Sequence, residues 1–449
     1  MGRHHGPRSR QPPHADRARL AEYQRAHDAY EHVGQPIPAQ EAPSTPDTPT
    51  SEPVDHEQTE QTTPPKKPAS PAPARREPVP TIDAAALATT HIITAEAWQW
   101  WQDQADTPAS WTADHLSSRG LSAEHGYAPA SWDGLVNHLR AQGFTEQQII
   151  DAGVATTTRD GRTIDRFRDR LVMPVRSSGG RSVVAVTARA NPDLEDPRTP
   201  KYINTPETAL YSKRATLYGL DEEAIDALHH GARPVILEGP MDVAAIRALG
   251  RDDLVPVAPC GTALTPEQLD LLRANGADLS RAVVAFDADG AGNTAAAKAW
   301  ELLEPSEAAT ARRLVLPAGA DPADLIKDGR ARDLDAALDA SPNLTEALIN
   351  QVAAGADLTT TESRVGLARL AATALARLPR DAASVDVVRD ILSEHVDPET
   401  FDWLLAEALD TSRHDGQKRP TSTSGPAAQG AAEATLSTTV SPRRGPAFS

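Results

Sequence analysis

Two stretches of this sequence, PVILEGPMDV (residues 234–243) and VVAFDADGAG (residues 283–292), decide its fold class. Each is a short apolar, β-branched run that ends on carboxylates beside glycine: Glu238 in the first stretch, and Asp287 and Asp289 in the second. Such runs predict buried strands. Carboxylates at the carboxyl ends of strands lie in the crevice where an open α/β sheet binds its ligands. Three oxygen ligands gathered there would suit Mg²⁺ or Mn²⁺, and such metals serve phosphate chemistry.

The neighbouring sequence continues the same alternation of apolar runs and helical patterns. LVPVA (residues 254–258) precedes TPEQLDLLRANG, and ARRLVLP (residues 311–317) precedes DPADLI. Alternation of this kind predicts an α/β fold, an open and mostly parallel sheet flanked by helices. Either acidic stretch alone would be typical of an ordinary turn. Both together, each before a helical pattern, favour a metal site.

The two ends of the chain have the composition of disordered segments. The first eighty residues hold 16 of the 38 prolines and few large apolar side chains, so they cannot bury enough surface to offset the entropy lost on ordering. The tail is rich in Ser, Thr, Pro and Ala. We therefore expect a disordered Pro-rich leader at 1–82, an N-terminal α+β lobe at 83–230, the α/β sheet domain at 231–320, a helical lobe at 321–411 and a disordered tail at 412–449.

Composition argues against several functional classes. A structural zinc site needs about four Cys or His ligands at close spacing; the sequence has one cysteine, Cys260, so no zinc is expected. The net charge of −18 argues against a nonspecific DNA coat but leaves room for a local basic patch. The start, MGRHHGPRSR, lacks the apolar region of a secretory signal, and no run of about 18 apolar residues occurs. We expect a cytoplasmic protein with no membrane partner.

Several motifs together carry a family resemblance. E-G-P-M-D followed by D-A-D-G-A-G resembles the Toprim domain of topoisomerases, primases and related nucleases. The flanking motifs resemble the catalytic core of bacterial DnaG-type primases, in the same order as in that family. These motifs are DRFRDRLVMPV (165–175), TARANP (187–192), KYINTPETALYSKRATLYGL (201–220) and VAPCGTALTPEQLDLL (257–272). The resemblance runs from about Trp98 to about Leu409 and implies a Toprim-type sheet between an N-terminal α+β lobe and a C-terminal helical lobe.

The resemblance assigns roles to the acidic residues. Glu238 matches the family's general acid/base or metal organiser, and Asp287 and Asp289 match its metal-holding D-x-D pair. Two metal ions would help a 3′-hydroxyl attack an α-phosphate, because they activate the oxygen and neutralise the developing charge. Asp242, four residues after Glu238, is expected to share a helical face with the start of that helix and to support the cluster.

The third acidic motif departs from the family pattern. Asp321 opens DPADL and is expected as a further metal ligand, but the commoner D-P-D motif has an aspartate where this chain has Ala323. The acidic cluster is therefore expected to be one ligand short or rearranged. The alternative for Asp321 is an N-cap of the following helix. Gly239, Gly290 and Gly292 carry no Cβ and would let backbone or nucleotide approach the acidic site.

A second set of residues is basic or polar. By resemblance, its members would line a groove for the phosphates of template and incoming nucleotide: Arg166, Arg168, Arg189, Lys201, Asn204 and Lys213. The alternative is a solvated charged strand, which is the usual meaning of alternating arginines. Tyr202 and Tyr211 are expected, like Asn204, to stack on bases or to hydrogen-bond to them.

The resemblance implies a DNA primase, which makes short RNA primers on single-stranded DNA from nucleoside triphosphates during DNA replication. A replicative helicase is a further candidate partner. Lack of the family's zinc-binding and helicase-binding domains would make this a reduced, accessory enzyme. The alternatives are a Toprim nuclease or strand-passage enzyme, and a non-catalytic nucleic-acid-binding replication protein. The motif from Lys201 to Leu220 argues against a simple nuclease, and Glu238, Asp287 and Asp289 argue against a non-catalytic protein.

Overall fold

The computed structural model describes residues 84–193, 199–261, 263–317, 319–379 and 383–418. The leader expected at 1–82 and the tail beyond residue 418 lie outside these residues. The chain divides into two compact units. The first runs to residue 302 and includes residues 312–341, and the second consists of residues 303–311 and the chain from residue 342.

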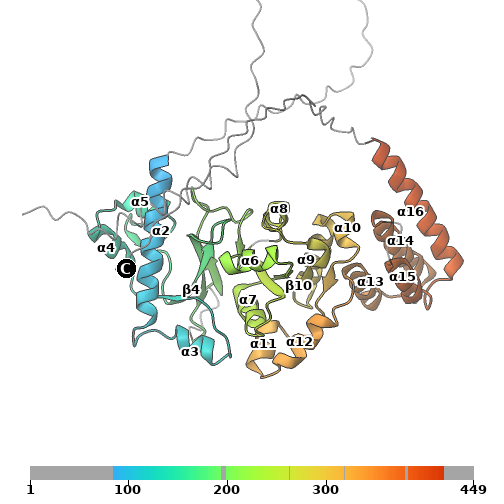
Figure 1. The fold of residues 1–449 in the computed structure, drawn as a ribbon, viewed down its shortest axis with the longest axis horizontal. Helices are drawn as coiled ribbons and strands as arrows, with labels where there is room; N and C mark the ends of the chain where they lie inside the picture. The colour runs from blue at the N-terminus through green and yellow to red at the C-terminus, as the bar shows by residue number, and fades with distance from the viewer. Residues whose placement is uncertain (1–83, 194–198, 262, 318, 380–382, 419–449) are drawn as a thin grey trace, which may run out of the picture. The chain divides into compact units, whose positions relative to one another are not determined.

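A five-stranded sheet in the order β11-β10-β8-β9-β7 forms the α/β domain of the first unit (Figure 1). Strands β8 (Arg233–Leu237), β9 (Leu254–Pro259), β10 (Val283–Ala285) and β11 (Arg312–Arg313) are parallel. The short strand β7 (Leu217–Tyr218) pairs antiparallel with β9 at one edge. The predicted open and mostly parallel sheet is confirmed, and its apolar strands are buried, as in sheets covered on both faces.

Helices follow these strands and begin at local capping signals. In α8, Thr265 and Gln268 form a reciprocal capping box and Pro266 occupies the first turn. In α7, Gly239 is the N-cap residue and Pro240 follows it. The helices of this domain are α6 (Glu222–His229), α7 (Pro240–Arg247), α8 (Pro266–Ala274), the 3-10 helix η1 (Leu279–Arg281), α9 (Gly290–Leu302), α11 (Pro322–Lys327) and α12 (Ala331–Asp339).

The N-terminal lobe contains an antiparallel sheet with helices packed against it. Its strands, in the order β1-β4-β5-β6, are β1 (Gly126–Ala128), β4 (Arg170–Arg176), β5 (Val183–Ala190) and β6 (Tyr202–Asn204). A hairpin of β2 (Ala155–Thr157) and β3 (Thr163–Asp165) lies beside it, with helices α2 (Ala84–Ala105), α3 (Thr112–Ser117), α4 (Gly134–Ala141) and α5 (Glu146–Asp151). Trp98 and Trp101 of α2 are buried in the core of this lobe.

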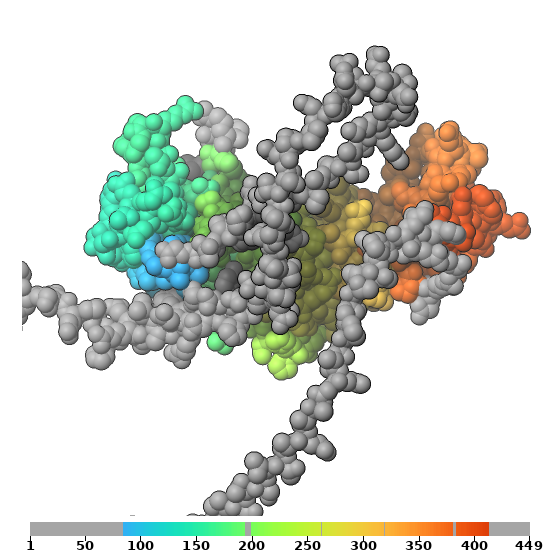
Figure 2. All heavy atoms as spheres, turned by 90° about the horizontal axis from the view of Figure 1, so that it is seen from above, coloured from blue at the N-terminus to red at the C-terminus, as the bar shows by residue number. Residues whose placement is uncertain are grey.

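Strand β4 joins the lobe to the α/β domain because its two faces belong to two cores. Leu171, Met173 and Val175 pack in a core that also contains Val235 of β8, whereas Val172 packs with α2 and α4. Successive side chains of a strand point to opposite faces, so one apolar run serves both cores. In the space-filling view of Figure 2, the blue-to-green atoms of the lobe lie directly against the yellow-green atoms of the α/β domain.

The second unit is helical, and two boundaries differ from the sequence expectation. Its helices are α10 (Pro305–Ala308), α13 (Leu344–Gly355), α14 (Thr361–Arg377), α15 (Ser384–Leu392) and α16 (Pro398–Lys418). Helices α11 and α12 instead belong to the first unit, because Leu325, Leu334 and Leu338 pack in its core. Helix α16 continues past residue 411, since no proline occurs before Pro420. None of the helices in the described ranges is both long and apolar enough to cross a membrane.

Candidate active site

Two of the predicted carboxylates are brought together by the register of parallel strands. Leu237 of β8 lies beside Ala285 of β10, so the residues that follow each strand meet at one edge of the sheet. There, Glu238 Oε1 accepts a hydrogen bond of 2.9 Å from the backbone N–H of Asp287. One oxygen of Glu238 is thus fixed by the neighbouring acidic loop.

Close packing in this acidic loop depends on Gly292. A Cβ there would collide with the carbonyl oxygen of Asp287 and would lie 2.8 Å from Glu238 Oε1. The Gly292 N–H also donates to Asp289 Oδ1 over 2.8 Å, so Asp289 caps the start of α9. A Cβ at Gly290 would meet nothing within 4 Å, and at Gly239 only Asp242 Oδ2 at 3.6 Å. Of the three glycines, Gly292 is the one that other atoms of the protein itself approach closely.

The carboxylates that surround this edge repel one another. Asp242, in the first turn of α7, has a pKa raised to about 7 by burial and by the charges of Asp321, Asp287 and Glu238. Asp287 has a pKa raised to about 6 by burial and by the charges of Glu238, Asp321 and Asp289. In both cases Lys201 acts in the opposite direction. The cluster therefore carries an excess of negative charge that a bound cation would relieve.

Asp321 has the geometry of the helix cap that was its alternative interpretation, yet it also lines the cavity described below. Its Oδ1 accepts from the backbone N–H of Asp324 over 2.6 Å at the start of α11. Ala323 is 2% exposed, so a buried methyl group stands where the commoner motif has a carboxylate. Asp324 lies 3.9 Å from the guanidinium of Arg119.

One cavity of about 400 Å³ gathers five acidic residues, Asp289 not among them, with three cations. Its size is within the range of small-molecule sites. The acidic members of its lining are Glu238, Asp242, Asp287, Asp321 and Asp324, and the basic members are Arg119, Arg189 and Lys201. Asn204 lines it as well, and its Nδ2 donates to the Cys260 carbonyl over 3.2 Å.

Tyr202 of β6 organises two of these cations. Its hydroxyl accepts from Arg189 Nη1 over 2.9 Å, and the Arg189 guanidinium lies 5.5 Å from the ring centroid. Lys201 Nζ lies 6.0 Å from the same ring. Contacts of this kind hold a cation against an aromatic face. The two positive charges are thereby kept at the cavity wall.

Three predicted basic residues do not line this cavity. Arg166 Nε donates over 3.3 Å to the backbone carbonyl of Asn204, which lines the cavity. Arg168 stacks on Trp132, with 4.7 Å from its guanidinium carbon to the ring centroid. The backbone N–H of Lys213 donates to Glu207 Oε1 over 2.9 Å.

The prediction that Tyr211 contacts bases was wrong. Its side chain is 1% exposed and packs in the core, beside the buried Cys260.

Two residues of interest were missed at the sequence level. Arg119 follows α3 in the turn at Gly120. In the sequence it is an isolated arginine before a glycine, which is not a signal for a functional residue. Trp132 lies just before α4 and belongs to none of the sequence motifs discussed above. It is 63% exposed, which is unusual for so large an apolar ring.

The acidic edge fits a divalent metal whose coordination is completed by substrate and water. Within the described ranges, no three His, Cys, Asp or Glu side chains converge closely enough to hold a metal ion by themselves. Magnesium usually keeps several waters and takes only one or two carboxylates together with substrate phosphates. An all-oxygen, mutually repelling carboxylate set at Glu238, Asp287 and Asp289 fits such a partly completed site.

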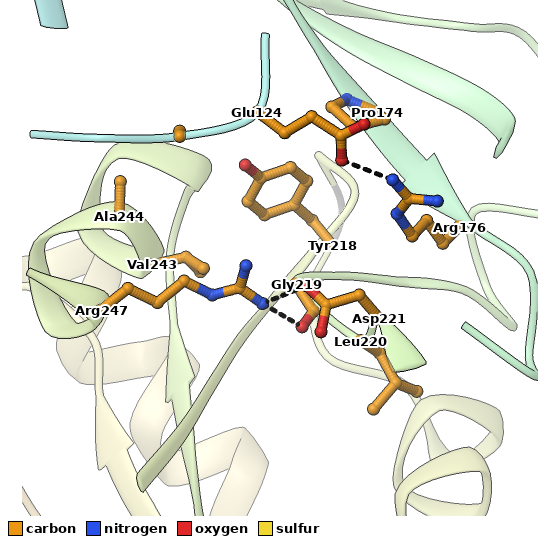
Figure 3. Close-up of a pocket in the computed structure, with 11 residues that line it drawn as sticks. Glu124, Pro174, Arg176, Tyr218, Gly219, Leu220, Asp221, Val243, Ala244 and Arg247 are labelled. Atoms are coloured by element: carbon orange, nitrogen blue, oxygen red, sulfur yellow. Dashed lines mark hydrogen bonds and ion pairs between the residues drawn. The ribbon is translucent and has the colours of Figure 1, made fainter. Parts of the chain in front are cut away.

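A smaller cavity of about 40 Å³ lies where the lobe meets the α/β domain (Figure 3). Two ion pairs border it: Arg176 with Glu124, and Arg247 with Asp221, whose Nη2 and Oδ2 are 2.6 Å apart. Tyr218 lines both this cavity and the larger one. The space suits a water molecule rather than a nucleotide. We conclude that this small cavity and its two ion pairs belong to the contact between the N-terminal lobe and the α/β domain.

Comparisons with known proteins agree with this geometry. A family model described as the DNA primase catalytic core, N-terminal domain, matches residues 102–224, and a Toprim-like model matches residues 235–326. The DNA primase of Streptomyces coelicolor is 35% identical over 315 residues, covering 67% of this chain and 47% of that protein. The DNA primase of Escherichia coli K12 is 31% identical over 296 residues, covering 64% and 49%. The chain thus spans about half the length of these curated relatives.

Solved structures of catalytic domains are matched almost completely. The RNA polymerase domain of Mycobacterium tuberculosis primase DnaG has a TM-score of 0.59 and 30% identity, covering 68% of this chain and 98% of that domain. A DnaG primase catalytic domain bound to single-stranded DNA has a TM-score of 0.57 and 29% identity, covering 69% and 99%. With matching family models, motif order and fold, this chain belongs to the DnaG-type DNA primases and contains their Toprim-bearing catalytic core.

Proposed function

We propose that this chain is a DNA primase that joins ribonucleotides into short primers on a single-stranded DNA template. The observation that carries the proposal is the single cavity that gathers five carboxylates with Arg119, Arg189 and Lys201. Nucleotidyl transfer needs cations for the triphosphate and carboxylates for a metal in the same place. Relatives solved with single-stranded DNA and with a double-stranded DNA oligomer that has a 6-nucleotide overhang support the choice of template.

The chain's own contribution is to hold its polar groups in position. A divalent cation, Mg²⁺ or Mn²⁺, would be held by Glu238, Asp287 and Asp289, with Asp321 beside them, and when bound it supplies charge neutralisation at the reacting phosphate. Backbone N–H groups occupy Glu238 Oε1 and Asp289 Oδ1, which leaves the second oxygen of each carboxylate for a ligand.

The cations of the cavity wall would bind the nucleotide. Arg189 and Lys201 lie against Tyr202, so little side-chain entropy is lost when they bind phosphate. Arg119 adds a third charge, which is only loosely compensated by Asp324 at 3.9 Å. Arg166 and Lys213 are proposed as further phosphate contacts outside this lining.

Trp132 and Arg168 would receive template bases. An exposed aromatic ring with a cation stacked on it is the usual surface on which single-stranded nucleic acid stacks. We name this pair, Trp132 with Arg168, the stacking platform. It belongs to the same lobe as Arg189 and Lys201, and it extends the proposed template path beyond the cavity.

The proposal is tested by incubating the protein with single-stranded DNA, labelled ribonucleotides and Mg²⁺ or Mn²⁺. Short labelled RNA is the expected product. Glu238→Gln, Asp287→Asn and Asp289→Asn should each abolish it while leaving the melting temperature nearly unchanged, because they remove ligands and not core. Asp226→Asn is the matched control: this carboxylate of α6 has a side chain 75% exposed, and its loss should be silent.

The other outcomes separate the rival functions. Cleaved DNA without RNA product would indicate a Toprim nuclease. DNA binding without either product would indicate a non-catalytic binding protein. Full activity of any of the three active-site variants would remove that residue from the site.

A further inference from the structure

Asp165, the last residue of β3, is a buried carboxylate whose bonds lead to another element. It is 2% exposed. Its Oδ2 accepts from the backbone N–H of Leu135 over 3.0 Å, and its Oδ1 accepts from that of Val136 over 2.9 Å. These two N–H groups belong to the first turn of α4, so Asp165 caps that helix from a distant strand.

The local cap residue of α4 does not perform this function. Asp133 occupies the N-cap position, but its side chain makes no capping hydrogen bond. The first N–H groups of a helix have no intrahelical partner and need an acceptor. The direction in which the chain enters α4, and so the placement of residue 132, is therefore set by Asp165.

The backbone of Asp165 contacts both members of the stacking platform. Its N–H donates to the Trp132 carbonyl over 2.8 Å, and its own carbonyl accepts from Arg168 Nη1. All of its polar groups thus lie between the start of α4, the backbone of Trp132 and the guanidinium that stacks on the Trp132 ring.

We infer that Asp165 is a positioning residue for single-stranded DNA binding: it holds Trp132 at the surface and Arg168 against its ring. The inference rests on the proposed function, because it assumes that the platform binds template bases. Burial of an exposed tryptophan ring against apolar surface is favourable in free energy, so the ring needs a contact that holds it outward. A ring fixed in its binding position loses less entropy when a base stacks on it, and so binds more tightly.

Asp165→Asn is the first test. The NH₂ group of the asparagine would face one of the two helix N–H groups, and both are donors. One of the two capping hydrogen bonds is therefore lost, while the side-chain volume is unchanged. We expect affinity for a labelled oligothymidylate, measured by fluorescence anisotropy, to fall roughly fivefold or more, as on losing one base stack. Asp165→Ser is the second variant, in case Asp165→Asn does not fold. The smaller serine side chain leaves room for a water molecule that can bridge the helix N–H groups.

Thr145→Ala is the matched control for loss of a helix cap. Thr145 Oγ1 accepts from the backbone N–H of Gln148 at the start of α5, in the same lobe and away from the platform. Loss of such a cap also lowers stability. DNA affinity should stay within twofold of wild type.

A double-mutant cycle with Trp132→Ala distinguishes positioning from general destabilisation. If Asp165 acts through Trp132, changing Asp165 in the Trp132→Ala background should produce no further loss of affinity. A loss of equal size in both backgrounds, or an Asp165 variant that binds like wild type while Trp132→Ala does not, would overturn the inference and leave the platform standing. Unchanged binding by Trp132→Ala would overturn the platform itself, and the inference with it.

Discussion

At the residue scale, the acidic loop of the candidate site depends on the absence of a side chain at position 292. Gly292→Ala would place a methyl group against the Asp287 backbone and 2.8 Å from Glu238 Oε1. Both are fixed groups, so the loop must move and the Glu238–Asp287 hydrogen bond must lengthen. We expect primer synthesis to fall at least tenfold, about 1.4 kcal/mol of transition-state stabilisation, when measured with saturating metal.

Gly290 supplies a control with the same chemistry two residues away. A Cβ there meets nothing within 4 Å, and the residue begins α9, where alanine is a better helix former. Gly290→Ala should retain activity and melt at the same temperature or slightly higher. Equal activities of the two alanine variants would refute the steric argument for Gly292.

At the element scale, α11 presents a methyl group where related motifs present a carboxylate. Ala323 is 2% exposed and lines the cavity beside Asp321, Asp242 and Asp287. Ala323→Asp would bury a further negative charge among groups that already repel one another. Without metal it should lower the free energy of unfolding by about 2 kcal/mol or more. Millimolar Mg²⁺ should restore part of this loss, because a cation that binds only the folded state stabilises it.

The control for this prediction lies on the next helix. Ala336 is an exposed residue of α12, so Ala336→Asp tests the same change without burial. Chemical denaturation of both variants, with Mg²⁺ and with a chelator, measures the effect. A magnesium response of Ala323→Asp no larger than that of Ala336→Asp would argue against a cation site at this edge.

The acidic edge of the candidate site could be predicted from the sequence, because its carboxylates follow directly after strands. Glu238 and Asp287 each end an apolar run, and parallel pairing of two such runs brings their carboxyl ends together. Arg119 and Trp132 could not be predicted in the same way. Their partners, Asp324 and Arg168, come from other segments, and no local pattern states which segments will meet. The prediction for Tyr211 was wrong for a related reason. Whether a side chain is exposed depends on which other segments pack over it, and the local sequence does not state this.

At the scale of the whole molecule, strand β4 shows what an apolar run can and cannot reveal. The unbroken apolar run LVMPV (residues 171–175) is typical of a buried strand, and β4 is buried on both faces. The run did not indicate that one face belongs to the lobe and the other to the α/β domain. That division brings Arg189 of β5 and Lys201, just before β6, into one cavity with Glu238 and Asp287, which follow β8 and β10. The chemistry of the site therefore depends on how the apolar side chains of β4 are divided between two cores.

The charge of the whole molecule also determines how it can bind nucleic acid. With a net charge of −18, the protein gains nothing from scattered lysines, and binding has to come from a local group of cations. Lys201 belongs to such a group, because it lines the cavity and lies against Tyr202. Lys298 is exposed on α9 and does not line that cavity, so it is a matched control of the same residue type.

Lys201→Ala should therefore weaken binding to single-stranded DNA and also lower its dependence on salt. Removing one phosphate-binding cation reduces the slope of log affinity against log salt by roughly 0.7 on a single strand. Lys298→Ala should change neither quantity, and Lys213→Ala tests whether the basic groove extends beyond the cavity. The measurement is anisotropy of a labelled oligonucleotide across a salt series. If Lys201→Ala kept the wild-type slope, Lys201 would not bind a DNA phosphate. Its closeness to the carboxylates would then serve only to offset their repulsion, which its effect on the pKa of Asp242 and Asp287 already indicates.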